Sequence, residues 1–291
     1  MSTFNIDFIG IGVEKAATYW VADCLKEHPD VCFAKQKELA FFNEYDQHFL
    51  EVKNPRYQRG LEWYSSFFED CTDDRLKGEY TPTYLYSSKA ADRIKKHFPD
   101  VKLICTLRNP IKRAFSQYLH DKSIGIIPDI SFEEAIETYD AYLEKGKYAK
   151  HLRKWIKLFG KENIHFIVTD DIKKRPVTEV KKLYAFLGID STFRPESLYK
   201  NPNPASIARF PWLNRFLMRS EYQMMSDSYA WIHKILEDLG IRRMVFWASY
   251  YINRKPLGDN YPKMEPKTER KLHNYYKRDS AQLRKLTGIT V

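Results

Sequence analysis

The chain of 291 residues has few cysteines, no long apolar run and no standard glycine-rich phosphate motif. Its four cysteines show neither C-x-x-C spacing nor a zinc-type grouping with histidine. Cys24 and Cys105 lie in apolar segments, so a reducing, cytoplasmic setting is the simplest expectation. No basic-then-apolar leader opens the chain, and the longest apolar run, MVFWASYYI at 244–252, is far shorter than the ~20 residues of a membrane span. These absences predict a soluble protein without a metal site.

The composition is that of a globular protein with an excess of positive charge. Hydrophobic residues make up 43% of the chain and charged residues 30%, and the net charge is +10. This charge favours an anionic partner, such as a nucleotide, a sulfated or phosphorylated small molecule, an acidic glycan or nucleic acid. A generally basic, solvated surface is the alternative. Because the basic residues are spread throughout and no RNA- or DNA-binding motif is present, a nucleic-acid-binding module is disfavoured.

Short apolar segments alternate with amphipathic ones along the first two hundred residues. The strand candidates are 6–11, 31–34, 101–107 and 164–168, and the helix candidates are 18–28, 88–98, 110–121, 131–144, 147–159 and 176–187. This alternation predicts an α/β, P-loop-like three-layer fold, with a central parallel sheet flanked by helices. We expect a single domain over 1–291, with an aromatic-rich helical insertion or acceptor lid at 205–260 and a final amphipathic helix.

Two pairs of residues mark helix ends in this pattern. Ser131 and Glu134 have the spacing of a capping box, which starts a helix. Pro176 and Gly188 stand at a helix start and just past a helix end, the positions that each residue favours.

The first phosphate-site candidate is the stretch IDFIGIGVEKAATYW, at 6–20. A strand meets a turn that carries Gly10 and Gly12, and a helix pattern opens at Thr18, whose hydroxyl could bind a phosphate together with the helix N-terminus. Lys15 stands where the G-x-G-x-x-G motif needs glycine, and the Gly-Lys pair of G-x-x-x-x-G-K-[ST] is missing. The alternative is that Thr18 only caps the helix and Lys15 is a solvated loop residue.

The second candidate lies at the end of the 101–107 strand. Arg108 stands at the carboxyl end of this strand and Ser116 near the second turn of the following helix, so both could contact a phosphate. A nucleoside-triphosphate hydrolase or kinase would usually have a Mg²⁺-binding aspartate where Arg108 stands, so that function is the disfavoured alternative. An arginine paired with a carboxylate at the sheet edge is the other interpretation.

Taken together, VEKAATYW and LRNPIKRAFSQY resemble the two donor-binding motifs of the sulfotransferase family, in the branch of heparan sulfate and many bacterial sulfotransferases. Further similar segments are KEHPDVCFAKQKELAFFN, GLEWYSSFF, GEYTPTYLYSS and KYAKHLRKWIKLFGKENIHFIVTDDI. The resemblance implies 3′-phosphoadenosine 5′-phosphosulfate (PAPS) as sulfuryl donor and adenosine 3′,5′-bisphosphate (PAP) as product, without a metal.

The same resemblance assigns roles to the motif residues. The 5′-phosphosulfate would be held by the first motif, namely by Lys15, Ala16, Ala17, Thr18 and the adjacent Tyr19. Arg108 and Ser116 would hold the 3′-phosphate, and Lys200, in a loop at 199–206, is a further donor-binding candidate. Lys15 and Glu38 would be catalytic, with Glu38 of KELAFF as the general base, partly buried among Phe41 and Phe42.

Several alternatives and departures accompany these roles. Without the resemblance, Glu38 is a surface carboxylate beside lysines, and His48 and His120 are the other candidate bases. Glu79 could orient Lys15. The chain has Ala17 where the family usually has glycine, and Tyr80 where the glycan enzymes often have lysine.

The acceptor is left open by the sequence. We expect a small-molecule or carbohydrate acceptor, such as a natural product of secondary metabolism or a glycolipid. The aromatic segment at 205–260 is its expected wall, with a homodimer interface or a membrane-surface contact as alternatives.

Overall fold

Five parallel strands in the order β2-β3-β1-β4-β5 form the central sheet. The computed structural model describes residues 4–46, 51–200, 206–224, 231–232, 235–236, 239–256 and 262–291. The strands of the sheet are β1 (Phe8–Gly12), β2 (Val31–Phe33), β3 (Leu76–Tyr80), β4 (Lys102–Leu107) and β5 (Ile164–Val168). The predicted α/β fold with a central parallel sheet is therefore confirmed.

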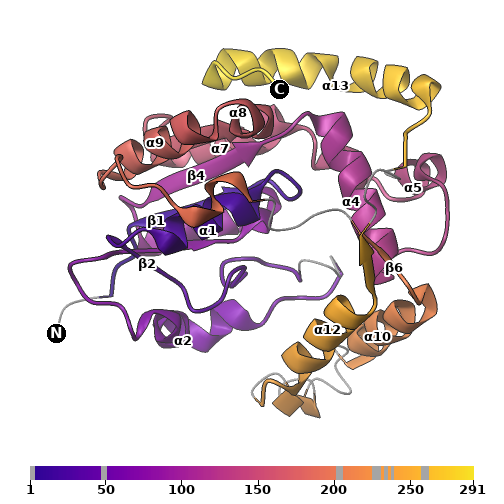
Figure 1. Ribbon diagram of the computed structural model, residues 1–291, viewed down its shortest axis with the longest axis horizontal. Coiled ribbons are helices and arrows are strands. Elements are labelled where there is room, and N and C mark those ends of the chain that lie inside the picture. The colour runs from indigo at the N-terminus through magenta and orange to yellow at the C-terminus, as the bar shows by residue number, and fades with distance from the viewer. Residues whose placement is uncertain are drawn as a thin grey trace.

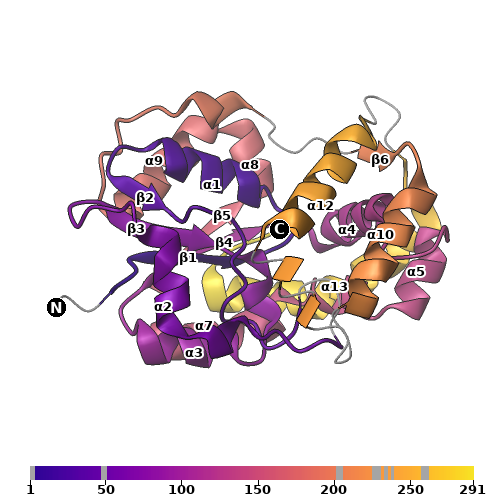
Figure 2. The ribbon, with the colours of Figure 1, turned by 90° about the horizontal axis from the view of Figure 1, so that it is seen from below.

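Helices cover both faces of the sheet. They are α1 (Thr18–Glu27), α2 (Gly60–Ser65), α3 (Ala90–His97), α4 (Pro110–Ile124), α5 (Phe132–Thr138), α6 (Ala141–Glu144), α7 (Tyr148–Phe159), α8 (Thr169–Lys174), α9 (Pro176–Leu187), α10 (Pro211–Met224), α12 (Ile241–Ile252) and α13 (Pro266–Thr287). Helices α1, α8 and α9 lie on one face of the sheet, and α2, α3 and α7 lie on the other (Figure 2). Their apolar side chains pack with those of the strands in two clusters, one on each face. A separate apolar cluster joins α4, α5, α6 and α13.

The predicted helix ends are confirmed, with one helix interrupted. Ser131 and Glu134 form the expected capping box, and α9 runs from Pro176 to a left-handed Gly188. The helix expected over 131–144 is instead split into α5 and α6, because the backbone of Tyr139 is extended. After this break, the Tyr142 hydroxyl donates to Asp121 of α4 at 2.8 Å.

Strand β3 is the one strand of the central sheet that the sequence did not predict. Its sequence LKGEY is not apolar, yet Glu79 and Tyr80 are fully buried. The strand occupies the place between β1 and β2, so it joins the first strand to the sheet edge.

Gly10 and Gly12 lie inside β1 and not in the turn after it, so their predicted position is wrong. A Cβ atom at Gly10 would stand 2.2 Å from the ring of Tyr80, and one at Gly12 would stand 3.0 Å from Leu85. Neighbouring side chains therefore require these glycines.

The expectation of a reducing setting loses its basis, because Cys32 of β2 forms a disulfide with Cys71. Their Cα atoms lie 5.6 Å apart although 39 residues separate them in the chain, so the spacing did not reveal the pair. Disulfides are typical of oxidising compartments. Cys24 and Cys105 are buried free thiols, as predicted. No helix within the described residues combines the length and apolar character that crossing a membrane requires.

The described residues between 206 and 256 form an arm beside the main body. Helices α10 and α12 lie below α4 and strand β6 (Ser206–Ala208) in Figure 1, and β6 pairs antiparallel with β7 (Arg254–Pro256). The arm is anchored at the end of α4, where the Asn214 side chain donates to the Ser123 carbonyl at 2.7 Å. The predicted helical character is confirmed for α10 and α12, whereas the strand pair was not expected.

Candidate active site

The carboxyl ends of β1 and β4 bring the two predicted phosphate-binding segments together. The two strands pair directly, and after a shift of register between Gly10 and Gly12, Gly12 lies opposite Cys105. The Val13 amide then donates to the Thr106 carbonyl at 2.8 Å, and the Arg108 guanidinium donates to the Lys15 carbonyl at 2.8 Å. Ligands of open parallel sheets bind at this edge.

The N-terminus of α1, which follows the first loop, is available to bind an anion. No side chain caps this helix at Ala17, and its first turn contains no acidic residue. The backbone N–H groups that follow Ala17 and the partial positive charge of the helix are therefore available to an anion. Thr18 is buried at the first position of the helix, while Tyr19 is exposed.

Ala17 adopts the left-handed backbone conformation that usually favours glycine. Its φ is 61°, and the φ of Lys15 is 64°, so two L-residues make the turn that the sequence assigned to Gly10 and Gly12. Glu38 (φ 63°) and Ala40 (φ 52°) share this conformation in the neighbouring loop. They complete the set of non-glycine residues with positive φ in the described part of the chain. Backbone strain of this kind clusters at functional sites.

We expect Ala17→Gly to raise the free energy of unfolding by about 0.5–1 kcal/mol. The left-handed conformation costs an L-residue about 1–2 kcal/mol, part of which is offset by the larger entropy of glycine in the unfolded chain. Urea denaturation would measure the change. The control is Ala16→Gly, because Ala16 has no positive φ and should lose stability on substitution. A loss of stability in both variants would contradict this account of the loop.

Lys15 lies in a strongly charged environment. Burial lowers the pKa of its ammonium, whereas the nearby carboxylates of Asp121, Glu14 and Glu38 raise it. Glu14 in turn pairs with Lys145 at 2.7 Å, which ties the first loop to the chain after α6. The electrostatic influence of Glu38 on Lys15 places these two candidate catalytic residues in one neighbourhood.

Glu38 is held at the carboxyl end of β3. Its amide donates to the Tyr80 carbonyl at 3.1 Å, and its carboxylate pairs with the Lys37 ammonium. The side chain of Glu38 is 26% exposed, whereas Phe41 and Phe42 point into the core. Glu38 is therefore partly buried, as expected, and the charged partner of its carboxylate is Lys37.

Lys37 is the site residue that sequence reasoning missed. Its side chain is only 9% exposed, and its ammonium lies 3.9 Å from the ring centroid of Tyr19, a cation–π contact. The ion pair and this ring contact connect the Glu38 loop to α1. The lysine next to Glu38 in KELAFF was the available signal, but the sequence analysis gave it no role in the site.

Glu79 does not orient Lys15 through any hydrogen bond that the described residues show. Its buried carboxyl accepts from the hydroxyls of Tyr84 and Thr81, both at 2.7 Å, and of Tyr64 at 3.1 Å. The Thr81 hydroxyl also accepts from the Ala40 amide at 3.2 Å, so Glu79 supports the Glu38 loop indirectly. Burial raises the pKa of Glu79 to about 7, although the three hydrogen bonds oppose this shift.

This raised pKa predicts a pH-dependent cost of Glu79 to stability. Between its unfolded value near 4.5 and about 7, the folded state binds more protons, so the free energy of unfolding falls as the pH rises. Glu79→Gln removes this dependence. The free energy of unfolding of the variant minus that of the wild type should therefore be about 3 kcal/mol larger at pH 8 than at pH 4. Denaturation at several pH values tests this, with exposed Glu62→Gln as control, and a constant difference would contradict it.

The other predicted site residues lie on elements apart from the first loop and the Glu38 loop. Ser116 and His120 lie on α4, both half-buried and one turn apart. Lys200 is exposed and pairs with Glu196 at 3.6 Å, and its charge affects Asp23 of α1. His48 lies outside the described residues.

Tyr80 fills the space beneath the first loop. Its buried hydroxyl donates to the Gly12 carbonyl at 2.6 Å and lies 3.1 Å from the Thr106 hydroxyl. Tyr80, which stands where the glycan enzymes of the resemblance often have lysine, therefore links β1, β3 and β4. It presents no charge to the site.

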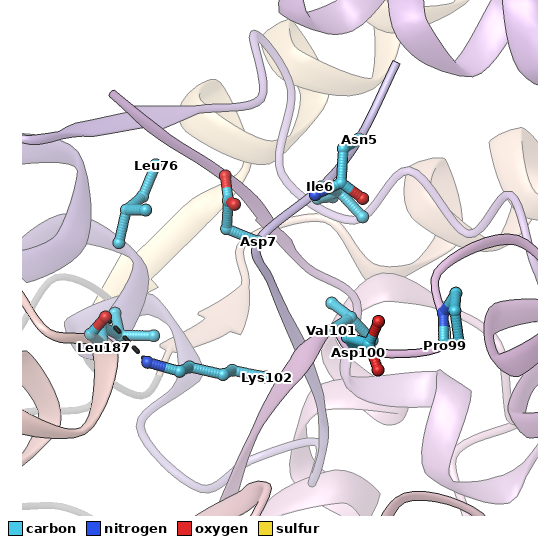
Figure 3. Close-up of a pocket in the computed structure, with 9 residues that line it drawn as sticks. All are labelled: Asn5, Ile6, Asp7, Leu76, Pro99, Asp100, Val101, Lys102 and Leu187. Carbon is cyan, nitrogen blue, oxygen red and sulfur yellow. Dashed lines mark hydrogen bonds between the residues drawn. The ribbon is translucent and has the colours of Figure 1, made fainter. Parts of the chain in front are cut away.

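A cavity of about 310 Å³ lies at the opposite edge of the sheet. Its lining includes Asp7, Leu76 and Lys102, where β1, β3 and β4 begin, as Figure 3 shows. The Lys102 ammonium there caps the end of α9 through the Phe186 and Leu187 carbonyls. Because ligands of parallel sheets bind at the carboxyl edge, this cavity is not the donor site.

Comparison with known proteins decides the family. A model described as the sulfotransferase domain matches residues 5–288. The chain belongs to the sulfotransferase family. It is thus a sulfotransferase domain.

Individual relatives agree with this assignment. Heparan sulfate glucosamine 3-O-sulfotransferase 6 of Mus musculus is 30% identical over 253 residues, covering 84% of this chain and 69% of the relative. The Homo sapiens protein of that name is 28% identical over 241 residues, covering 80% and 66%. The mouse 3-O-sulfotransferase 3A1 is 30% identical over 201 residues, and this match covers 66% of the chain and 48% of that relative. The chain thus spans about half to two thirds of the length of these relatives.

A solved structure confirms the fold of the sulfotransferase domain. The sulfotransferase from Alicyclobacillus acidocaldarius superposes with a TM-score of 0.71, and the match covers 99% of this chain and 98% of that one. The sequence identity is 21%.

Proposed function

We propose that this chain transfers the sulfuryl group of PAPS to a hydroxyl or amine of a small-molecule acceptor, with Glu38 as the general base. The observation that carries the proposal is the hydrogen bond from Arg108 to the Lys15 carbonyl, which unites the two predicted donor-binding loops. The influence of Glu38 on the Lys15 ammonium supports its place beside them.

The residues at the carboxyl edge fit a donor with two anionic ends. Lys15 and the backbone N–H groups of Ala16, Ala17 and Thr18 would hold the 5′-phosphosulfate, because α1 begins there without a side-chain cap or an acidic first turn. Arg108 would hold the 3′-phosphate, with Ser116 as a further hydrogen-bond donor. The N-terminus of α4 is less available, because the Asn109 side chain already accepts from Ile111 and Lys112.

Two side chains would perform the chemistry. PAPS supplies the sulfuryl group to be transferred and leaves as PAP. Glu38 accepts the proton as the acceptor O–H or N–H bond breaks and the new bond to sulfur forms. Lys15 neutralises the charge that grows on the oxygen of the departing phosphate. The Lys37 ammonium holds the Glu38 carboxylate in position for this proton transfer.

The acceptor is proposed to bind between the Glu38 loop and α10. The Tyr222 hydroxyl of α10 donates to the Glu51 carboxylate at 3.4 Å. Three residues after Glu51, the Asn54 side chain donates to the carbonyl of Ala40 in the Glu38 loop at 2.6 Å. The arm therefore reaches the neighbourhood of the proposed base. The named activity of the curated relatives, 3-O-sulfation of glucosamine, favours a sugar hydroxyl. A glycolipid or a sugar-bearing natural product of secondary metabolism offers this group.

Transfer of label from sulfur-labelled PAPS to pools of sugars, glycolipids and natural products tests the proposed function. We expect a labelled product in the presence of a metal chelator. Lys15→Ala should lower kcat by about 10²–10³-fold, because a preorganised cation at the departing oxygen is lost. Exposed Lys157→Ala serves as control. Label transfer that Lys15→Ala leaves unchanged would refute the proposed role of the first loop.

A further inference from the structure

The arm from 206 to 256 carries most of the exposed apolar side chains of the described residues. Eleven of the sixteen large hydrophobic side chains that are exposed there lie in the arm. Both of the exposed tryptophans, Trp212 (67%) and Trp231 (64%), are among them. Single exposed apolar residues are common on protein surfaces, but a concentration of this kind usually marks an interaction site.

Helix α10 has one attached side and one free side. Buried Met218 and the hydrogen bond of Asn214 to Ser123 mark the side that packs against the body. Trp212 and Phe216, one turn apart, are 67% and 64% exposed on another side. Arg215 and Arg219 accompany them at helical spacing and are also exposed.

Helix α12, which is attached to α10, also carries exposed apolar side chains. Asn214 of α10 accepts from Ser249 and from Asn253 at 2.9 Å, which fixes the two helices together. Ile241, Met244 and Val245 are exposed on α12, with Met244 at 63%. The exposed residues Trp212, Phe216, Ile241, Met244 and Val245, together with Arg215 and Arg219, are named the α10–α12 face below.

The arm also has an excess of positive charge. Residues 206–256 contain eight lysines and arginines but only four aspartates and glutamates, because acidic residues are sparser here than in the chain as a whole. Exposed Arg209 and Lys255 extend the positive charge to the base of the arm. Aromatic and aliphatic side chains interspersed with arginines are the features of helices that lie in a lipid headgroup region.

We propose that the α10–α12 face docks on a membrane surface that contains anionic lipids. Trp212 and Phe216 insert among the headgroups, and Arg215 and Arg219 contact the lipid phosphates and carboxylates. A second copy of the chain fits this face less well, because a symmetric dimer would place the same basic surface against itself. This proposal concerns only the location of the protein, so it does not depend on which acceptor is sulfated.

Co-sedimentation with vesicles tests the docking. The probes are vesicles of phosphatidylcholine alone and vesicles with about 30% phosphatidylserine, at low salt and at about 0.5 M salt. We expect the wild type to bind the anionic vesicles, and to bind them less at high salt. Trp212→Ala/Phe216→Ala and Arg215→Glu/Arg219→Glu should each weaken this binding by about tenfold or more.

The matched control is Tyr139→Ala, because Tyr139 is an exposed aromatic residue outside the arm, and it should bind as the wild type does. Circular dichroism and PAP affinity verify that each variant is folded. The proposal would be overturned if the wild type remained in the supernatant when the anionic vesicles sediment. It would also be overturned if the double variants bound these vesicles as tightly as the wild type does. Light scattering that shows a wild-type dimer which Trp212→Ala/Phe216→Ala dissociates would overturn it as well, because a second copy would then cover the face.

Discussion

Glu38→Gln should lower kcat by about 10²–10⁴-fold while the affinity for PAP stays within about twofold of the wild type. Glutamine keeps the size of the side chain but cannot accept the acceptor's proton. The donor-binding groups are on other segments, namely the loop after β1 and the end of β4. Turnover with labelled PAPS and calorimetric titration with PAP measure the two quantities.

The control for this experiment is Glu62→Gln, since Glu62 is an exposed carboxylate on α2. It should leave both quantities unchanged. If Glu38→Gln instead abolished PAP binding and turnover together, Glu38 would be a structural residue of the loop and not the base. His120 on α4 would then be the next candidate to replace.

Arg108→Ala should weaken PAP binding by about 10- to 150-fold, which is the range for losing charge-assisted hydrogen bonds to a phosphate. Arg108→Lys should recover only part of this loss, because lysine retains the charge but not the planar fork of donors. Titration with PAP measures both variants. Exposed Arg270 of α13 provides a matched control, since Arg270→Ala removes a charge far along the chain from either loop.

The hydrogen bond from Arg108 to the Lys15 carbonyl adds a second consequence. Without this hydrogen bond the first loop loses a contact that positions Lys15, so kcat should also fall in Arg108→Ala. Unchanged PAP affinity in this variant would contradict the proposed 3′-phosphate site.

The sequence predicted the layers of the fold because its strands and helices differ in period and are bounded by clear end signals. Ser131 with Glu134, and Pro176 with Gly188, marked helix ends correctly. The meeting of the two phosphate-binding segments was also predictable, since the carboxyl ends of parallel strands share one edge. Strand β3 was missed because Glu79 is buried through three hydroxyl donors, which no hydrophobic pattern reveals.

The details of the site depended on contacts between distant segments. Gly10 was assigned to a turn because glycine is typical of turns, but the Tyr80 ring, seventy residues away, is what excludes a side chain there. The disulfide likewise joins distant segments, Cys32 of β2 and Cys71. Lys37 and Glu38 are neighbours in the chain, and what depends on the fold is the burial of the Lys37 side chain. Ala17 was the departure from the family pattern, and its left-handed backbone shows that the loop keeps the glycine-like shape without glycine.

The central claim is that Arg108 and the Lys15 loop form one site for a nucleotide with a 3′-phosphate. Comparing PAP with adenosine 5′-monophosphate, which lacks that phosphate, in wild type and in Arg108→Ala tests it most directly. The wild type should bind PAP about 10- to 100-fold more tightly, and in Arg108→Ala the two nucleotides should bind about equally. An affinity ratio that stays the same in both proteins would contradict the claim, because Arg108 would then not interact with the 3′-phosphate.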